Sequence, residues 1–199
     1  MPQELILASG SQIRQEMLRN AGLDFGVHVA RVDEEMIRDA MLAEDAPPRD
    51  IADSLAEMKA RKISDKNPDA LVIGCDQVLS FERKLLSKPL SPEEARAQLI
   101  EMRGKRHELL SAVVICEAGK PVWRHVGVVR MTMGRFSDGY LDGYIERNWE
   151  SIRHSVGAYK LEEEGVRLIK QIDGDYFTVL GLPLLNLLSY LGLRGVIEQ

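Results

Sequence analysis

Residues 70–89, ALVIGCDQVLSFERKLLSKP, place a carboxylate directly after an apolar run. The run Leu71-Val72-Ile73 is typical of a buried strand, and Asp76 follows it closely. A buried carboxylate is costly unless a cation pairs with it or a ligand binds it, and open α/β sheets often place their chemistry at strand ends. Lys88 comes soon after a hairpin expected at residues 82–84. We therefore predict a functional site at Asp76 with Lys88 as its cationic neighbour; the alternative is a surface turn with a solvated lysine.

Composition limits the classes of partner. The chain has 199 residues, enough for one domain with a sizeable core, and a formal net charge of -5. This acidic balance argues against broad nucleic-acid binding, although a local basic pocket for a small anion stays possible. Cys75 and Cys116 lie far apart in apolar runs, so we expect buried free thiols and a cytoplasmic setting. We also expect no signal peptide in residues 1–30 and no stretch that spans a membrane.

The first helix is expected to begin at a turn of small residues. Residues 4–8 are expected to form a strand, Ser9-Gly10-Ser11 follows, and residues 12–21 carry a helical pattern. Such a junction offers free backbone N–H groups and a positive dipole end, which suit phosphate. Arg14, in the first helical turn, opposes the helix dipole. A bound anion would reconcile the two, and the alternative is an arginine in solvent.

Two further charged features point to ligands. Asp33, Glu34 and Glu35 follow a possible strand at 25–30, and three adjacent carboxylates could hold a hard divalent cation through their oxygens. The alternative is a solvated loop or a helix N-terminus. In the amphipathic helix expected over residues 47–63, Lys59 falls near the middle of the apolar stripe. A lysine there must either extend its amine to solvent or meet an anion.

The rest of the chain is expected to be mainly scaffold. His107 is more typical of a structural than of an acid/base histidine, and Ser111 could face a ligand. The other expected elements are a capped helix at 91–103, an antiparallel strand pair at 106–116 and 122–133, a helix at 137–147, a charged loop at 155–165, a strand at 166–172 and a last helix ending near 191.

Eight ordered motifs resemble those of one protein family over nearly the whole chain. They are LILASGSQIRQEMLRNAGLDF at 5–25, VDE at 32–34, AEMKA at 56–60, VIGCDQV at 72–78, SKP at 87–89, GKRHELLSAVVI at 104–115, VGAY at 156–159 and IDGDYFTVLGLPL at 172–184. On these motifs the chain resembles the Maf family of nucleotide pyrophosphatases.

The resemblance implies a fold, a reaction and a set of residues. The expected fold is a single α/β domain over 1–199, with a mixed, strongly twisted sheet flanked by helices, similar to the inosine triphosphate pyrophosphatases. The expected assembly is a homodimer. The reaction is hydrolysis of a nucleoside triphosphate to the monophosphate and pyrophosphate with Mg²⁺ or Mn²⁺. By position, the implied catalytic residue is Asp76, the polar site residues are Glu34, Lys59 and Lys88, and the phosphate-end residues are Ser9, Ser11 and Arg14. Asp76 and Glu34 would hold the metal.

Three positions depart from residues that are common in the family or in its members resembling the dTTP/UTP hydrolases, and they bear on the substrate. Residues 11–14 read SQIR where SPRR is commonest, so Ile13 replaces the first arginine. Gln77 follows the catalytic aspartate, as in members similar to the 7-methyl-GTP pyrophosphatases, where the dTTP/UTP type often has threonine. Glu162 stands where that type tends to carry glutamine, and its carboxylate can accept hydrogen bonds from a guanine. We therefore expect 7-methyl-GTP as substrate. The alternatives are a dTTP/UTP pyrophosphatase and a non-catalytic, nucleotide-binding regulator of cell division.

Overall fold

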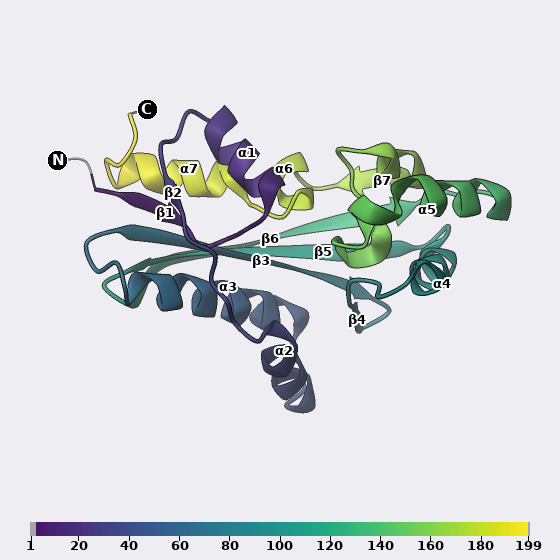
Figure 1. Ribbon diagram of the computed structural model, residues 1–199, viewed down its shortest axis with the longest axis horizontal. Helices are drawn as coiled ribbons and strands as arrows, with labels where there is room; N and C mark the ends of the chain where they lie inside the picture. Colours follow the sequence, from purple (N-terminus) through teal and green to yellow (C-terminus); the bar gives the residue numbers. More distant parts are fainter. Residues whose placement is uncertain (1–2, 199) are drawn as a thin grey trace. The chain divides into compact units, whose positions relative to one another are not determined.

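Seven strands form one mixed sheet within residues 3–198, the part of the chain that the computed structural model describes (Figure 1). The strands are β1 (Leu5–Leu7), β2 (Gly26–Val27), β3 (Leu71–Phe81), β4 (Lys84–Leu86), β5 (Arg106–Glu117), β6 (Lys120–Met133) and β7 (Ile169–Asp173). Their order is β2-β1-β3-β5-β6-β7, and β4 pairs with β3 outside this path. β1 is parallel to β2 and β3, whereas β4 is antiparallel to β3 and β7 to β6. The predicted α/β class with a mixed sheet flanked by helices is confirmed.

Helices occur between the strands and after the last one. They are α1 (Gln12–Asn20), α2 (Glu34–Ala43), α3 (Pro48–Ser64), α4 (Pro92–Met102), α5 (Asp138–Ile152), α6 (Tyr176–Val179) and α7 (Leu184–Leu193), with the 3-10 helices η1 (Val156–Ala158) and η2 (Glu164–Leu168). Helix α4 begins as the sequence predicts, because the Ser91 hydroxyl accepts a hydrogen bond from Glu94 N–H. No helix formed by residues 3–198 has the length and apolar character needed to cross a membrane.

The chain divides into two compact units, and each is described here by itself. Unit 1 contains the described residues up to Gln77, together with Leu110–Gly127 and the chain from Gly181 onward. Unit 2 contains Val78–Leu109 and Val128–Leu180. In unit 1, α1 and α7 lie on one side of the strands and α3 lies on the other (Figure 1). That residues 1–199 act as one domain stays a prediction.

Helix α3 lies unusually close to strand β3 at Gly74. A Cβ atom added to Gly74 would lie 2.2 Å from the carbonyl oxygen of Ala56 and 2.7 Å from the amide nitrogen of Ala60. The helix presents the small residues Ala56 and Ala60 at this contact, and both are fully buried. Because the two backbones touch here, Lys59 on α3 can reach Asp76, which lies two residues beyond Gly74 on β3.

Two hairpins have connections of two residues. Glu82 and Arg83, with φ of 48° and 67°, join β3 to β4, and Ala118 and Gly119, with φ of 47° and 74°, join β5 to β6. Positive φ at both central residues is typical of type I′ turns, whose twist matches that of the strands. A parallel pair would need a much longer crossover, so β5 and β6 form the predicted antiparallel pair.

Three expectations about element bounds need correction. Asp76 does not follow the strand but lies inside it, because β3 continues to Phe81 and Lys59 compensates the buried charge. Asp33 and Glu34 do not form a solvated loop, because they begin helix α2, whose N-terminus Asp33 caps through Met36 N–H; the alternative of a helix N-terminus is thus confirmed. The last strand, β7, begins at Ile169 rather than at 166, because the preceding residues form the 3-10 helix η2.

The contact at Gly74 generates a prediction. The Gly74→Ala substitution should lower the free energy of unfolding by about 1–3 kcal/mol, the usual cost of overpacking a core, because the new methyl group meets backbone rather than a movable side chain. Urea denaturation followed by circular dichroism measures this change.

Gly26→Ala is the matched control, since a Cβ atom at this strand glycine would meet only ordinary contacts at 3.9 Å. Equal stabilities for the two variants would show that the close approach of α3 to β3 does not constrain the fold.

Candidate active site

Lys59 joins two carboxylates in unit 1. Its Nζ lies 2.7 Å from Asp76 Oδ1 and 2.8 Å from Glu34 Oε1. The side chains of Lys59 and Asp76 are 10% and 9% exposed, whereas that of Glu34 is 45% exposed. The expectation that Lys59 meets an anion on the core side of its helix is therefore confirmed, and the snorkelling alternative is wrong. The structure brings together three of the four residues expected to catalyse the reaction.

The environment of Asp76 changes its acidity. Burial raises the pKa of Asp76 above that of an ordinary aspartate, and the Glu34 carboxylate acts in the same direction. The positive charges of Lys59 and Arg14 oppose this rise in pKa. A carboxylate with a raised pKa holds a proton more strongly, which suits a general base. Its basic form is present above the raised pKa and is lost as the pH falls through that value.

Arg14 connects three segments that are distant in the sequence. Its Nε donates to the carbonyl oxygen of Gly181 at 2.8 Å, and its Nη1 donates to Ser9 Oγ and to the carbonyl oxygen of Cys75, each at 3.3 Å. These bonds link the turn before α1, strand β3 next to Asp76, and the loop before α7. The alternative of an arginine in solvent is therefore wrong, whereas phosphate binding by Arg14 stays a prediction.

The turn at Ser9–Ser11 leaves the start of α1 open. Ser9 is buried and its Oγ accepts a hydrogen bond from Ser11 N–H at 3.3 Å. Ser11 is the N-cap residue, but its side chain makes no capping hydrogen bond, and the first turn of α1 contains no acidic residue. Ile13, in this first turn, is partly buried. Uncapped N–H groups at a helix start suit an anion, so the turn retains the property on which the phosphate prediction rests.

Gln77 is anchored by a neighbouring strand of unit 1. Its Nε2 donates to the Ser111 hydroxyl at 2.9 Å, and Ser111 on β5 is fully buried. Ser111 thus contacts Gln77, a candidate specificity residue. That Ser111 itself faces a ligand stays a prediction. No signal in the sequence pairs these two residues, because their strands become neighbours only in the folded sheet.

Two predicted site residues belong to unit 2. Lys88 lies in the exposed loop after β4, and Glu162 lies in an exposed turn before η2. Their participation at the same site as Asp76 stays a prediction. His107, also in unit 2, is buried and forms a 2.7 Å hydrogen bond with the Tyr159 hydroxyl. Burial lowers the pKa of His107 to about 4, so the ring is neutral at physiological pH and its predicted structural role is supported.

The carboxylates were tested for their fit to a divalent metal. No group of three or more His, Cys, Asp or Glu side chains within residues 3–198 is arranged to hold an ion. Asp76 and Glu34 do converge on one point, where Lys59 Nζ now lies. Mg²⁺ is commonly bound by one or two carboxylates plus substrate phosphates and waters. This pair of hard oxygen donors therefore fits a metal that arrives with the substrate, and the metal itself stays a prediction.

The buried ion pair generates a second prediction. Lys59→Met leaves Asp76 without its nearest cation, and breaking a buried pair in this way costs about 3–5 kcal/mol. We expect a loss of this size at pH 8 and a smaller loss at pH 5. The reason is that Asp76, whose pKa is already raised and would rise further without Lys59, takes up a proton as the pH falls.

Urea denaturation at the two pH values measures this loss, with Lys66→Met, at an exposed lysine beyond the end of α3, as the control. A loss that is the same at both pH values would contradict the role of Lys59 as the partner of a charged Asp76.

The sequence of this chain is similar to those of known proteins over nearly its whole length. The family described as Maf-like protein matches residues 4–193. The nucleoside triphosphate pyrophosphatase of Roseobacter denitrificans is 68% identical over 195 residues, covering 98% of each chain, and that of Ruegeria pomeroyi is 67% identical over 194 residues, with the same coverage. The 7-methyl-GTP pyrophosphatase of Brucella abortus is 46% identical over 191 residues, covering 96% of each chain. With a match over nearly its whole length, this chain belongs to the Maf family.

Proposed function

We propose that this protein hydrolyses the α–β phosphoanhydride of a nucleoside triphosphate and releases a nucleoside monophosphate and pyrophosphate. The observation that carries the proposal is the buried Asp76, held by Lys59 next to Glu34. The relatives with 67–68% identity, which are named nucleoside triphosphate pyrophosphatases, support the same reaction.

Asp76 is the proposed general base. Its raised pKa allows it to orient a water and accept a proton from it. The oxygen of that water bonds to the α-phosphorus, and the bond from the α-phosphorus to the α–β bridging oxygen breaks, so that pyrophosphate leaves with the bonding electrons. Lys59 fixes the Asp76 carboxylate through Oδ1 at 2.7 Å, and the second oxygen, Oδ2, is the one we assign to the water.

Cationic groups neutralise the phosphates in this proposal. Lys59 and Arg14 belong to the same unit as Asp76, and we add Lys88 from unit 2. The backbone N–H groups at Ser9–Ser11 bind phosphate oxygens and stabilise the charge that develops on the leaving pyrophosphate. Asp76 and Glu34 would hold Mg²⁺ or Mn²⁺, which would supply Lewis-acid polarisation of the phosphate oxygens.

For the base, we propose 7-methyl-guanine. Glu162 would accept hydrogen bonds from the N1–H and the exocyclic amine of the ring, while Gln77, anchored by Ser111, and Ile13 shape the rest of the base site. The Brucella abortus relative, named for this substrate, supports the choice at 46% identity. We further propose a cytoplasmic homodimer that binds nucleotides rather than nucleic acid.

The base role of Asp76 generates a third prediction. Asp76→Asn should lower kcat by about 10²–10⁴, the usual contribution of general acid–base catalysis, because an amide cannot take the proton. In the wild-type protein, activity should fall with decreasing pH at a value above the usual range for aspartate, since the basic form is lost there. Release of pyrophosphate, measured from pH 5 to 9, tests both statements. Undiminished turnover by a correctly folded Asp76→Asn protein would remove Asp76 from this role.

A substrate panel tests the base and provides the fourth prediction. We expect the highest kcat/KM for 7-methyl-GTP in a comparison with GTP, UTP, dTTP, CTP and ATP, first with Mg²⁺ and then with Mn²⁺. Preference for UTP and dTTP would keep the reaction but discard the roles of Gln77 and Glu162. Nucleotide binding without turnover, from a folded protein, would instead favour a non-catalytic regulator of cell division.

A further inference from the structure

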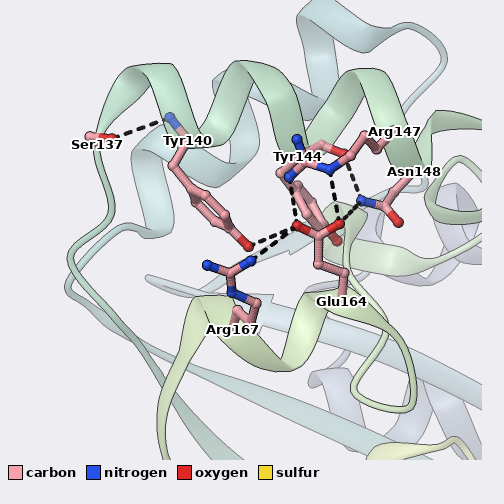
Figure 2. A network of polar contacts seen from close by, with 7 residues as sticks. All are labelled: Ser137, Tyr140, Tyr144, Arg147, Asn148, Glu164 and Arg167. Carbon is pink, nitrogen blue, oxygen red and sulfur yellow. Dashed lines mark hydrogen bonds and ion pairs between the residues drawn. The ribbon is translucent and has the colours of Figure 1, made fainter.

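Glu164 holds the start of η2 against helix α5 in unit 2. Its Oε1 accepts from the Tyr140 hydroxyl at 3.1 Å and from Arg147 Nη2 at 2.6 Å. Its Oε2 accepts from Arg147 Nε at 3.2 Å and from Asn148 Nδ2 at 2.8 Å. Figure 2 shows these donors converging from α5 on the single carboxylate, with Arg167 on its other side. Two parallel bonds from one guanidinium fix orientation as well as distance.

These hydrogen bonds keep Glu164 charged. The hydrogen bonds from Arg147 and then from Asn148 lower the pKa of Glu164 to about 2. The carboxylate therefore stays ionised at any pH at which the enzyme would be assayed. Arg167 Nη1 lies 3.8 Å from Glu164 Oε1, and the same guanidinium lies over the Tyr140 ring, 4.7 Å from its centroid. We call Tyr140, Arg147, Asn148 and Glu164 the clamp.

The same turn is attached to α5 a second time, one helical turn further along. The Ser151 hydroxyl contacts both oxygens of Glu163, at 2.8 and 2.7 Å, and accepts from Lys160 Nζ at 2.6 Å. Leu161 is buried. A Cβ atom added to Gly165 would lie 2.5 Å from the Lys160 carbonyl oxygen, so the two ends of the turn are in close contact. Residues 160–165 are therefore fixed by contacts on both sides of Glu162.

Glu162 differs from its two neighbours. Glu163 and Glu164 direct their oxygens to α5, whereas Glu162 is exposed and forms no hydrogen bond or ion pair with residues 3–198. Of these three consecutive carboxylates, the second and third attach the turn to α5, and the first, Glu162, is accessible to a ligand. A side chain presented from a fixed backbone loses less conformational entropy on binding than one on a mobile loop.

We propose that Glu164 and Arg147 are positioning residues for base selection, which hold the 160–165 turn so that Glu162 presents its carboxylate to the nucleobase from a fixed backbone position. This inference rests on the proposed function, since it assumes that Glu162 reads the base. The contacts of the clamp all lie within unit 2, where they hold the turn that carries Glu162. The clamp therefore acts on the choice of substrate and not on the chemical step.

The fifth prediction concerns Glu164→Gln, which keeps the size of the side chain and removes its charge. We expect the ratio of kcat/KM for 7-methyl-GTP to that for UTP to fall about tenfold through KM, the discrimination that about 1.4 kcal/mol provides. We expect kcat for 7-methyl-GTP to stay nearly unchanged, because the contact to the base stabilises the bound ground state and the transition state equally, so that its loss appears in KM. Hydrogen exchange at the amides of 160–168 should become faster. Arg153→Gln, on the exposed surface at the end of α5, is the control. It should change neither the ratio of kcat/KM values nor the hydrogen exchange of residues 160–168.

A double-mutant cycle separates positioning from general weakening of the fold. In a Glu162→Gln background, Glu164→Gln should have no further effect on the ratio, because the group that it positions is already gone. Arg147→Lys, which retains the charge but not the two parallel bonds, should give an intermediate ratio. A common melting temperature across the variants would exclude global unfolding as the cause.

The possible failures are distinguishable. A wild-type protein that is silent on every nucleotide would overturn the proposed function, and this inference with it. A wild-type protein with a clear base preference that persists in both Glu164→Gln and Arg147→Lys would overturn the positioning role alone. Additive effects of Glu162→Gln and Glu164→Gln on the ratio of kcat/KM values would also overturn the positioning role, because additivity means that the two residues act independently.

Discussion

The ion pair between Lys59 and Asp76 is the interaction on which the candidate active site depends. A carboxylate in the interior of a central strand would be prohibitively costly without a partner, and Lys59 Nζ, 2.7 Å away, supplies it. The partner must come from α3, and α3 reaches it only because Gly74 lets the helix backbone touch the strand. Gly74, which has no side chain, thus determines where the Asp76 carboxylate can be buried. The packing of α3 on β3 and the ion pair of the site therefore depend on each other.

Glu34 is the exposed member of the cluster around Lys59. It is far more exposed than Asp76, and it is the first residue of α2, a helix with no buried side chain among those described. The two carboxylates that contact the Lys59 amine therefore differ in their access to solvent, since one is buried in the sheet and the other lies at the start of a surface helix.

The sequence predicted the local features of this site better than its long-range contacts. Lys59 could be identified because helical periodicity places it on the apolar stripe, and Asp76 because it interrupts an apolar run. The capped start of α4 was equally local. The sequence could not show that β3 continues through Asp76, because that depends on the compensating charge from α3. It also could not show that Arg14 donates to the Gly181 and Cys75 carbonyls, or that Glu164 binds α5, because these partners lie far along the chain.

The contacts of Arg14 also have a consequence for biosynthesis. A ribosome adds Arg14 to the chain 167 residues before Gly181, to whose carbonyl oxygen the Arg14 Nε donates. Strand β1 lies between β2 and β3, so it can pair with β3 only after Leu71–Ile73 have been synthesised. The bonds from Arg14 to Ser9 and Cys75 can form before Gly181 is made, whereas the bond to Gly181 must follow. A chain that stops before Gly181 would lack this contact, so the Arg14 contacts are completed late in the synthesis of these residues.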